Sequence, residues 1–175
     1  MDIRWYIPGR KIVVNDRMQK NYSYHLSQKY GDLSDAPEFR PELTPDQMLR
    51  MGVFEGKYLN DCQKEFPKEW FRHGKFSSGD PDPSLNYFNI KSRQPLPVWK
   101  TKGWLYGDDV RGWFQWYCRF YIGRRDPNVD PLQIKRWRAF RRHKAQISKH
   151  CKSMDLSCRP KQRQALLQWA YDPIF

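Results

Sequence analysis

The sequence predicts a mainly α-helical fold: a single compact helical domain with a small β-hairpin or extended arm at its N-terminus. Three observations support this class. Apolar residues recur at helical spacing in the last third of the chain, helix-start residues precede those segments, and β-prone runs lie near the N-terminus. The chain has 175 residues, enough for one domain with its own core. We expect the arm to cover residues 1–43 and the basic helical domain to cover residues 44–175.

The N-terminal arm begins with two β-prone runs on either side of a Pro-Gly turn, in the stretch IRWYIPGRKIVV. This pattern predicts a hairpin over residues 3–14. Residues 15–43 are polar, with tyrosines and scattered charges. We expect most of them to form an extended arm or linker.

The middle of the chain contains several helix signals. Thr44 is a good N-cap and Gly52 is a natural stop, which predicts a helix between them. Two further short helices are expected at residues 55–64 and 67–74, the latter bounded by Pro and Gly. Residues 76–97 are rich in Pro, Ser and Asp, which indicates a long surface loop or a functional loop.

The last third of the chain is expected to contain three helices. The first covers residues 110–122 and is capped by Asp108 or Asp109. The second is the longest periodic segment, residues 130–152, which opens with Asp-Pro. The third covers residues 159–171 and opens with Arg-Pro.

The charge of the chain is unevenly distributed. Residues 1–100 hold 16 Lys/Arg against 13 Asp/Glu, a net of +3, whereas residues 101–175 hold 16 against 6, a net of +10. This asymmetry indicates a polyanionic partner, with nucleic acid as the default. A membrane surface is less favoured because no helix pairs a broad apolar face with Lys-rich flanks. No apolar run approaches the length of a transmembrane helix.

The stretch RGWFQWYCRFYIGRR, residues 111–125, interleaves aromatic rings with arginines. On a helix the rings cover more than half of the circumference, which is typical of a core helix. The alternative is that one or two edge rings, Trp113 or Tyr121, stack on a base. The flanking arginines would then contact phosphates: Arg111, Arg119, Arg124 and Arg125.

The next predicted helix is strongly basic, with no acidic residue between Asp130 and Asp155. Basic clustering on one helix face is the electrostatic pattern of nucleic-acid binding. The candidate phosphate contacts on this helix are Lys135, Arg138, Arg141 and Arg142, with Lys149 projecting on the same side. A third basic group, Arg159, Lys161 and Arg163, lies at a helix N-terminus, where backbone N–H groups attract anions.

Two histidines and two cysteines lie within sixteen residues: His143, His150, Cys151 and Cys158. These are zinc-ligand types, but the spacing lacks the close cysteine pair of structural zinc sites. Core thiols with polar surface histidines are the preferred interpretation, and a local disulfide between Cys151 and Cys158 is the alternative in an oxidising setting. We expect no metal and no cofactor.

Candidate catalytic residues are few. Asp108 and Asp109 are explained by helix capping. Either one, beside Arg111 and Trp113, also fits the carboxylate that a base-excising enzyme uses next to a flipped base. Asp61, near Tyr58 and Cys62, is a second candidate. No Gly-rich phosphate loop or nucleophile elbow is present.

Several segments of the sequence resemble a family of small, largely uncharacterised Trp/Arg-rich proteins of viruses, bacteria and fungi. The resemblance covers residues 44–172 and rests on the segments MGVFEGKYLNDCQKEFPKEWF, SLNYF, SRQPLPVWKTKGW, RGWFQWYCRFYIGRR, QIKRWRAFRRHKAQI and CRPKQRQALLQWAYD. It implies one domain that spans these segments. It implies no particular activity and no catalytic residues.

The expected function is nucleic-acid binding, to DNA rather than RNA, through a basic face with aromatic stacking. One alternative is a glycosylase-like enzyme that acts on DNA bases in a pocket of Asp and aromatic residues. Another is a structural, virion or assembly protein that binds an acidic partner. The N-terminal residues MDIRWYIPGRK lack an apolar signal core, so we expect an intracellular protein, in the cytoplasm, the nucleus or a virion. Reduced thiols are then the simpler state of the cysteines.

Overall fold

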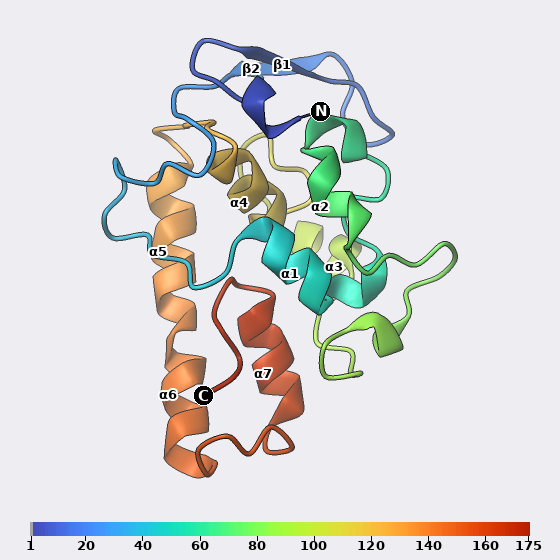
Figure 1. Cartoon of the computed structure of the whole chain (residues 1–175), viewed down its shortest axis with the longest axis vertical. Coiled ribbons are helices and arrows are strands. Elements are labelled where there is room, and N and C mark those ends of the chain that lie inside the picture. Colours follow the sequence, from blue (N-terminus) through green and yellow to red (C-terminus); the bar gives the residue numbers. More distant parts are fainter. Residues whose placement is uncertain (1) are drawn as a thin grey trace. The chain divides into compact units, whose positions relative to one another are not determined.

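The computed structural model describes residues 2–175, which form short helices and one small antiparallel sheet (Figure 1). Much of the chain lies in turns and loops, so the expected mainly helical class holds only in part. The residues divide into two compact units, described separately below. Unit 1 contains the described residues up to Arg40, Leu59–Arg72 and Gln94–Ile134, and unit 2 contains Pro41–Tyr58, His73–Arg93 and Lys135–Phe175.

The chain passes from unit 1 to unit 2 after Arg40, close to the boundary expected at residue 43, but later segments return to both units. The elements of unit 1 are η1 (Ile3–Trp5), β1 (Lys11–Val14), β2 (Tyr22–His25), η3 (Gln63–Glu65), α2 (Lys68–Arg72), α3 (Leu96–Thr101) and α4 (Trp113–Tyr121). Those of unit 2 are α1 (Pro45–Met51), η2 (Phe54–Gly56), η4 (Pro83–Leu85), α6 (Arg142–His150) and α7 (Pro160–Leu167). Helix α5 (Asp130–Phe140) passes from one unit to the other.

The N-terminal sheet differs from the predicted hairpin. Residues 3–5 form the 3-10 turn η1, and β1 pairs with β2, with Ile12 opposite Tyr24. Side chains alternate across the sheet, so Ile12, Val14 and Tyr24 point into unit 1 and are buried. The segment expected to be an extended arm therefore supplies a strand, and farther along it buries Phe39.

Helix α4 is the centre of unit 1. Its rings Trp116, Tyr117 and Phe120 surround Phe39 at centroid distances of 5.3, 5.5 and 5.5 Å. All three are almost inaccessible to solvent, which confirms the prediction that most rings of this helix are core. The helix begins later than expected, with Gly112 as its N-cap, because Asp109 lies in a preceding turn and makes ion pairs instead.

Unit 2 contains a left-handed turn where the sequence predicts a helix over residues 55–64. Phe54, Glu55 and Gly56 have φ of 54°, 56° and 67°. Such angles are strained for residues other than glycine and persist only where neighbouring contacts hold them. Here the loop over residues 76–97 wraps the turn: the amide of Glu55 donates to Asn86 Oδ1 at 2.8 Å, and Glu55 pairs with Arg93.

The other helix starts agree with the sequence. Thr44 caps α1 in a reciprocal capping box with Gln47, and the helix ends at Gly52. Helix α7 begins at Pro160. The long basic segment is two helices, α5 and α6, separated at Arg141, whose φ and ψ of −55° and −24° are themselves helical. No helix in residues 2–175 has the combination of length and apolar character that crossing a bilayer requires.

Gly123 provides a stability test of unit 1, because it has a φ of 112° and a Cβ added there would lie 2.1 Å from the carbonyl oxygen of Gln28. Gly9 also has a positive φ, 81°, but no atom lies within 4 Å of an added Cβ. Substitution of Gly9 therefore measures the cost of the backbone conformation without a steric clash. We expect Gly9→Ala to lower the free energy of unfolding by about 1 kcal/mol and Gly123→Ala by a further 1–3 kcal/mol, roughly. Urea unfolding measures both. Equal losses would contradict the packing of Gly123 against Gln28.

Candidate nucleic-acid interface

Arg119, expected to contact phosphates, lies instead in the interior of unit 1 and is inaccessible to solvent. Its Nε donates to Glu65 Oε1 at 2.6 Å and its Nη2 donates to Glu65 Oε2 at 3.1 Å. The remaining N–H groups donate to the backbone carbonyl of Asp108, the Asp109 carboxylate and the side chain of Gln19. Because a guanidinium has five N–H donors, this side chain is fully satisfied within the protein.

The carboxylates around Arg119 determine its charge state. Burial acts to lower the pKa of Arg119, but the neighbouring acidic groups, Glu65 first and then Tyr24 and Asp109, together outweigh burial and raise the pKa. Arg124 is in the same situation, because its Nη2 donates to Asp109 Oδ2 at 2.6 Å and Asp109 raises its pKa against the effect of burial. Tyr24 completes the cluster by donating its hydroxyl to Glu65 at 2.8 Å. Both guanidinium groups stay charged.

The two other arginines of this group also pair with acids of unit 1. Arg111 is buried and donates to Asp16 at 2.9 Å and Asp61 at 3.1 Å. Burial acts to raise the pKa of Asp16, but the hydrogen bond from Arg111 contributes to a net lowering. Arg125 is half-buried and donates two hydrogen bonds, of 2.8 and 2.9 Å, to the Asp35 carboxylate. These hydrogen bonds lower the pKa of Asp35.

The aromatic candidates also make contacts within the protein. Trp113 is buried, and its indole N–H donates to the backbone carbonyl of Gln133 at 3.3 Å. Tyr121 is half-buried and packs edge-on against Tyr30, with ring centroids 5.2 Å apart. The alternative that an edge ring of α4 stacks on a base is therefore wrong for Trp113, which is part of the core, whereas Tyr121 keeps partial exposure.

Two of the three catalytic candidates, Asp109 and Asp61, also pair with arginines. Asp109 is 1% exposed and both of its carboxylate oxygens accept hydrogen bonds from arginines. Asp108 is exposed, and what it contributes to the cluster is its backbone carbonyl, which accepts from Gln19 and Arg119. Asp61 pairs with Arg111 and Arg17. The Asp109 and Asp61 carboxylates are thus held in ion pairs with arginines, whereas the carboxylate of Asp108 is exposed and takes no part in the cluster.

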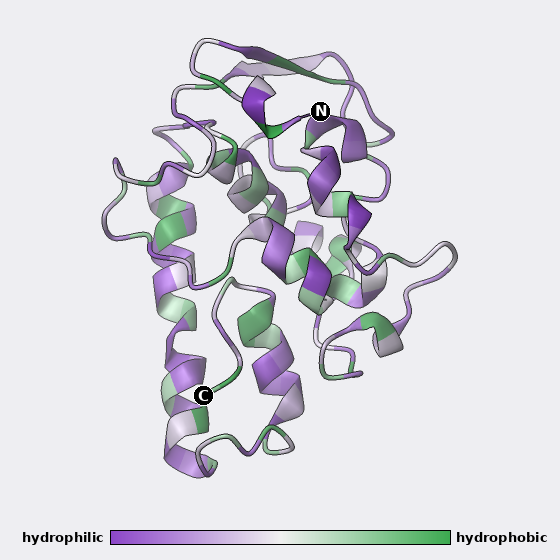
Figure 2. Cartoon of the chain, in the orientation of Figure 1, coloured by the Kyte–Doolittle hydropathy of each residue, from purple (hydrophilic) through white to green (hydrophobic). Residues whose placement is uncertain are grey.

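Unit 2 presents the remaining basic candidates to solvent. Four of them, Lys135, Arg138, Arg142 and Lys149, are exposed and are here named the α5–α6 cationic stripe. At 3.6 residues per turn they fall within about 60° of arc on the helical segment, opposite the side that carries Trp137 and Ile147. Among the interactions of residues 2–175, none of these four forms an ion pair. In Figure 2, α6 and the first turns of α7 are mostly at the hydrophilic end of the scale.

The first turn of α7 packs beside α6. Gln162 Nε2 lies 2.9 Å from His143 Nδ1 and donates to Gln146 Oε1 at 2.7 Å. Arg159 and Lys161 flank this contact and are exposed, as expected of residues that bind an anion. Arg163 differs from the expectation, because it is buried and donates to three backbone carbonyls of unit 2. Arg141 is exposed next to the stripe.

The His/Cys group does not form a metal site. Cys151 and Cys158 are joined in a disulfide, the alternative that requires an oxidising setting. Within residues 2–175, no three His, Cys, Asp or Glu side chains are placed to hold a metal ion. His143 contacts Gln162 instead, and its burial lowers its pKa.

The set of exposed basic candidates is therefore smaller than the sequence indicates, and the reason lies in the acids of the N-terminal part. Glu65, Asp16 and Asp35 are 54, 95 and 90 residues away from the arginines they pair with. Nothing in local spacing connects them. The only available signal was the near-balance of charge in residues 1–100, which supplies the acids that the arginines of α4 require.

The Glu65–Arg119 pair is testable by stability. Glu65→Gln keeps the shape of the side chain but leaves Arg119 buried beside a neutral group, so we expect a loss of about 3 kcal/mol in the free energy of unfolding. Asp2→Asn is the control, because Asp2 pairs with Arg4 at the exposed surface and surface pairs contribute little. Chemical unfolding at neutral pH measures both. A Glu65→Gln protein as stable as the Asp2→Asn protein would contradict the network.

Comparisons of the chain with protein-family models, with curated proteins and with solved structures found no match. Its function is therefore inferred from the charges and contacts of its own residues.

Proposed function

We propose that the protein binds nucleic acid, with duplex DNA as the preferred form, through the exposed cations of unit 2. The observation that carries the proposal is the α5–α6 cationic stripe. Residues 135–175 hold 11 Lys/Arg against 2 Asp/Glu, a net of +9. One cation, Arg163, is buried, and Lys144 pairs with Glu42. The stripe residues have no such acidic partner within the described chain.

The length of the stripe suits a polyanion. From Lys135 to Lys149 the helical segment rises about 21 Å at 1.5 Å per residue. Like charges three, four or seven residues apart on one helix repel one another and destabilise it by a few tenths of a kcal/mol per pair, roughly. A row of phosphates removes this repulsion and releases counterions when it binds. The acids that neutralise the arginines of α4 have no counterpart on this side of unit 2.

Two arguments favour DNA. An exposed helix of about 10–12 Å diameter fits the major groove of B-DNA, about 12 Å wide. The major groove of A-form RNA is deep and narrow and does not admit side chains in this way. The contacts proposed here reach phosphates, so they position the protein on the duplex without specifying sequence. Base stacking by α4 is not part of the proposal, because its rings are core.

The test replaces the four stripe residues by Gln: Lys135→Gln, Arg138→Gln, Arg142→Gln and Lys149→Gln. The matched control removes four exposed cations of unit 1: Lys20→Gln, Lys64→Gln, Lys68→Gln and Arg72→Gln. Anisotropy of a labelled duplex is measured over a series of salt concentrations. If all four stripe residues contact phosphates, the slope of log K against log salt falls by about 3.6 in the stripe variant. The control retains the wild-type slope.

Two results would contradict the proposal. One is equal weakening in the stripe and control variants, which would mean that net charge alone drives binding. The other is the absence of salt-dependent binding by the wild-type protein. Affinity for an acidic protein without affinity for DNA or RNA would instead favour the assembly-protein alternative.

A further inference from the structure

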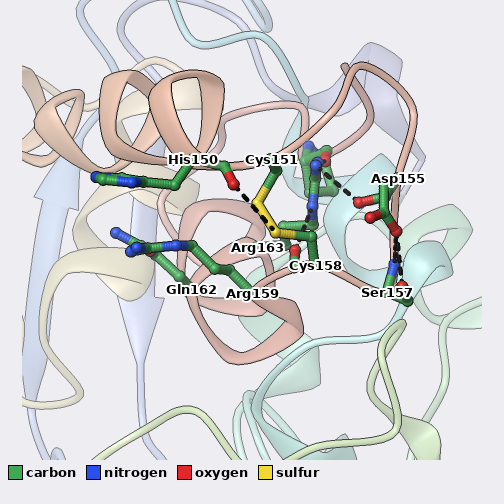
Figure 3. The surroundings of a disulfide bond; sticks show 9 residues. His150, Cys151, Asp155, Ser157, Cys158, Arg159, Gln162 and Arg163 are labelled. Atoms are coloured by element: carbon green, nitrogen blue, oxygen red, sulfur yellow. Dashed lines mark hydrogen bonds between the residues drawn. A yellow bond between two sulfur atoms is a disulfide. The ribbon is translucent and has the colours of Figure 1, made fainter.

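The connection between α6 and α7 is closed by a disulfide between Cys151 and Cys158, seven residues apart (Figure 3). Cys151 follows the last residue of α6, and Cys158 precedes Arg159, the N-cap of α7. Both cysteines are half-buried, so a small thiol in solution reaches them. The sulfur of Cys158 lies 3.9 Å from the carbonyl oxygen of His150, across the end of α6.

The disulfide loop is packed on its inner side. Arg163 donates to the carbonyls of Cys158 and Asp155, within or beside the loop, and to that of Pro173 near the C-terminus. The amide of Met154 donates to Phe175 at 3.3 Å. A single buried guanidinium thus ties the loop to the start of α7 and to the C-terminal segment.

The outer side of the same loop carries the cation Arg159. Figure 3 shows the side chains of His150, Arg159 and Gln162 projecting to one side of the disulfide, away from Asp155 and Ser157. Arg159 has a left-handed backbone, with φ of 55° and ψ of 48°. This conformation is unfavourable for a residue with a Cβ and requires support from its neighbours. The Arg159 side chain donates to Gln162 Oε1 at 3.2 Å, and its backbone carbonyl accepts from the amides of Gln162 and Arg163. The adjacent disulfide joins Cys158 to the residue that follows α6.

The two other cysteines do not compete for oxidants. Cys62 and Cys118 are buried in unit 1, and their burial raises the pKa of each thiol. A thiol in that state is inert to exchange. Cys151 and Cys158 are the remaining two of the four cysteines of the chain. Redox chemistry at cysteine is therefore confined to the loop between the cationic helices.

We propose that the Cys151–Cys158 disulfide controls nucleic-acid binding by unit 2: the oxidised form binds tightly and the reduced form binds more weakly. This inference rests on the proposed function, since it concerns the same surface. In the oxidised form, Arg159 and Lys161 are held beside the α5–α6 cationic stripe as a pre-organised set. In the reduced form the loop opens, and these two cations must be ordered again when phosphate binds, which weakens affinity. The stripe itself is unchanged, so binding is reduced and not abolished.

The reductant is a low-molecular-weight thiol such as glutathione. One glutathione thiolate attacks a sulfur of the disulfide, forms a mixed disulfide with that cysteine and releases the other cysteine as a thiolate. A second glutathione thiolate then attacks the glutathione sulfur of the mixed disulfide and releases the remaining cysteine. Two electrons and two protons pass to Cys151 and Cys158, which become thiols. Two glutathione thiols are oxidised to one glutathione disulfide, and the reverse exchange restores the loop.

The experiment uses the full chain in two glutathione buffers, one oxidised and one reduced. Intact mass after alkylation counts the free thiols, and anisotropy of the labelled duplex gives Kd. We expect reduction to weaken binding by about threefold to tenfold and to lower the salt slope by about 1–2. The double variant Cys151→Ser/Cys158→Ser should show the weaker affinity in both buffers. Trypsin should cleave after Lys152 only when the loop is open.

The outcomes separate this inference from the proposed function. If oxidised wild-type protein does not bind the duplex, the proposed function fails and the inference fails with it. If it binds, but with the same Kd after reduction, only the redox inference is overturned. Failure of the disulfide to form in the oxidised buffer overturns it as well. If the double variant does not fold, the comparison of oxidised and reduced wild-type protein still decides the question.

Discussion

The bidentate pairing of Arg119 with Glu65 organises unit 1, and the arrangement of charge elsewhere in the chain follows from it. A guanidinium enters a protein interior only if carboxylates and carbonyls replace its water, because an unpaired buried charge is strongly destabilising. Here η3 supplies Glu65, the turn before α4 supplies Asp108 and Asp109, and the segment after β1 supplies Gln19. One side chain of α4 thereby joins three separate parts of the unit.

This arrangement gives the acids of the first hundred residues a structural role. Together with Asp109 they pair with the arginines in and next to the aromatic helix: Arg111, Arg119, Arg124 and Arg125. This Arg-rich region is therefore internally balanced. The segment from Lys135 to Lys161 carries accessible positive charge with Asp155 as its single acid, whereas the exposed Lys and Arg residues earlier in the chain are interspersed with acids. Both regions contain arginines, but those of the unit 1 cluster are paired with carboxylates, whereas those of the basic surface in unit 2 are exposed. Only the latter are available to a polyanion.

The disulfide loop and the left-handed turn at Phe54–Gly56 show the same principle within unit 2. The turn, whose backbone is unfavourable by itself, is held by the loop that carries Asn86 and Arg93. The disulfide loop is held by Arg163, five residues after Cys158, together with the Cys151–Cys158 bond. The two segments differ in the kind of interaction that holds them. The turn is held by packing and hydrogen bonds, whereas the loop depends on a bond that a thiol cleaves and an oxidant restores.

The sequence by itself determined the helix starts at Thr44, Asp130 and Pro160, the core role of the α4 rings, and the exposed face of the basic helices. These features follow from caps and periodicity, which act over a few residues. The tertiary structure alone decided the pairing of β1 with β2, the left-handed turn, the disulfide, and which arginines are buried. Those outcomes depend on groups as far as 100 residues apart, as between Gln19 and Arg119. An arginine on a helix has the same local pattern whether its partner is a phosphate in solution or a carboxylate in the core, and only the folded chain brings that carboxylate to it.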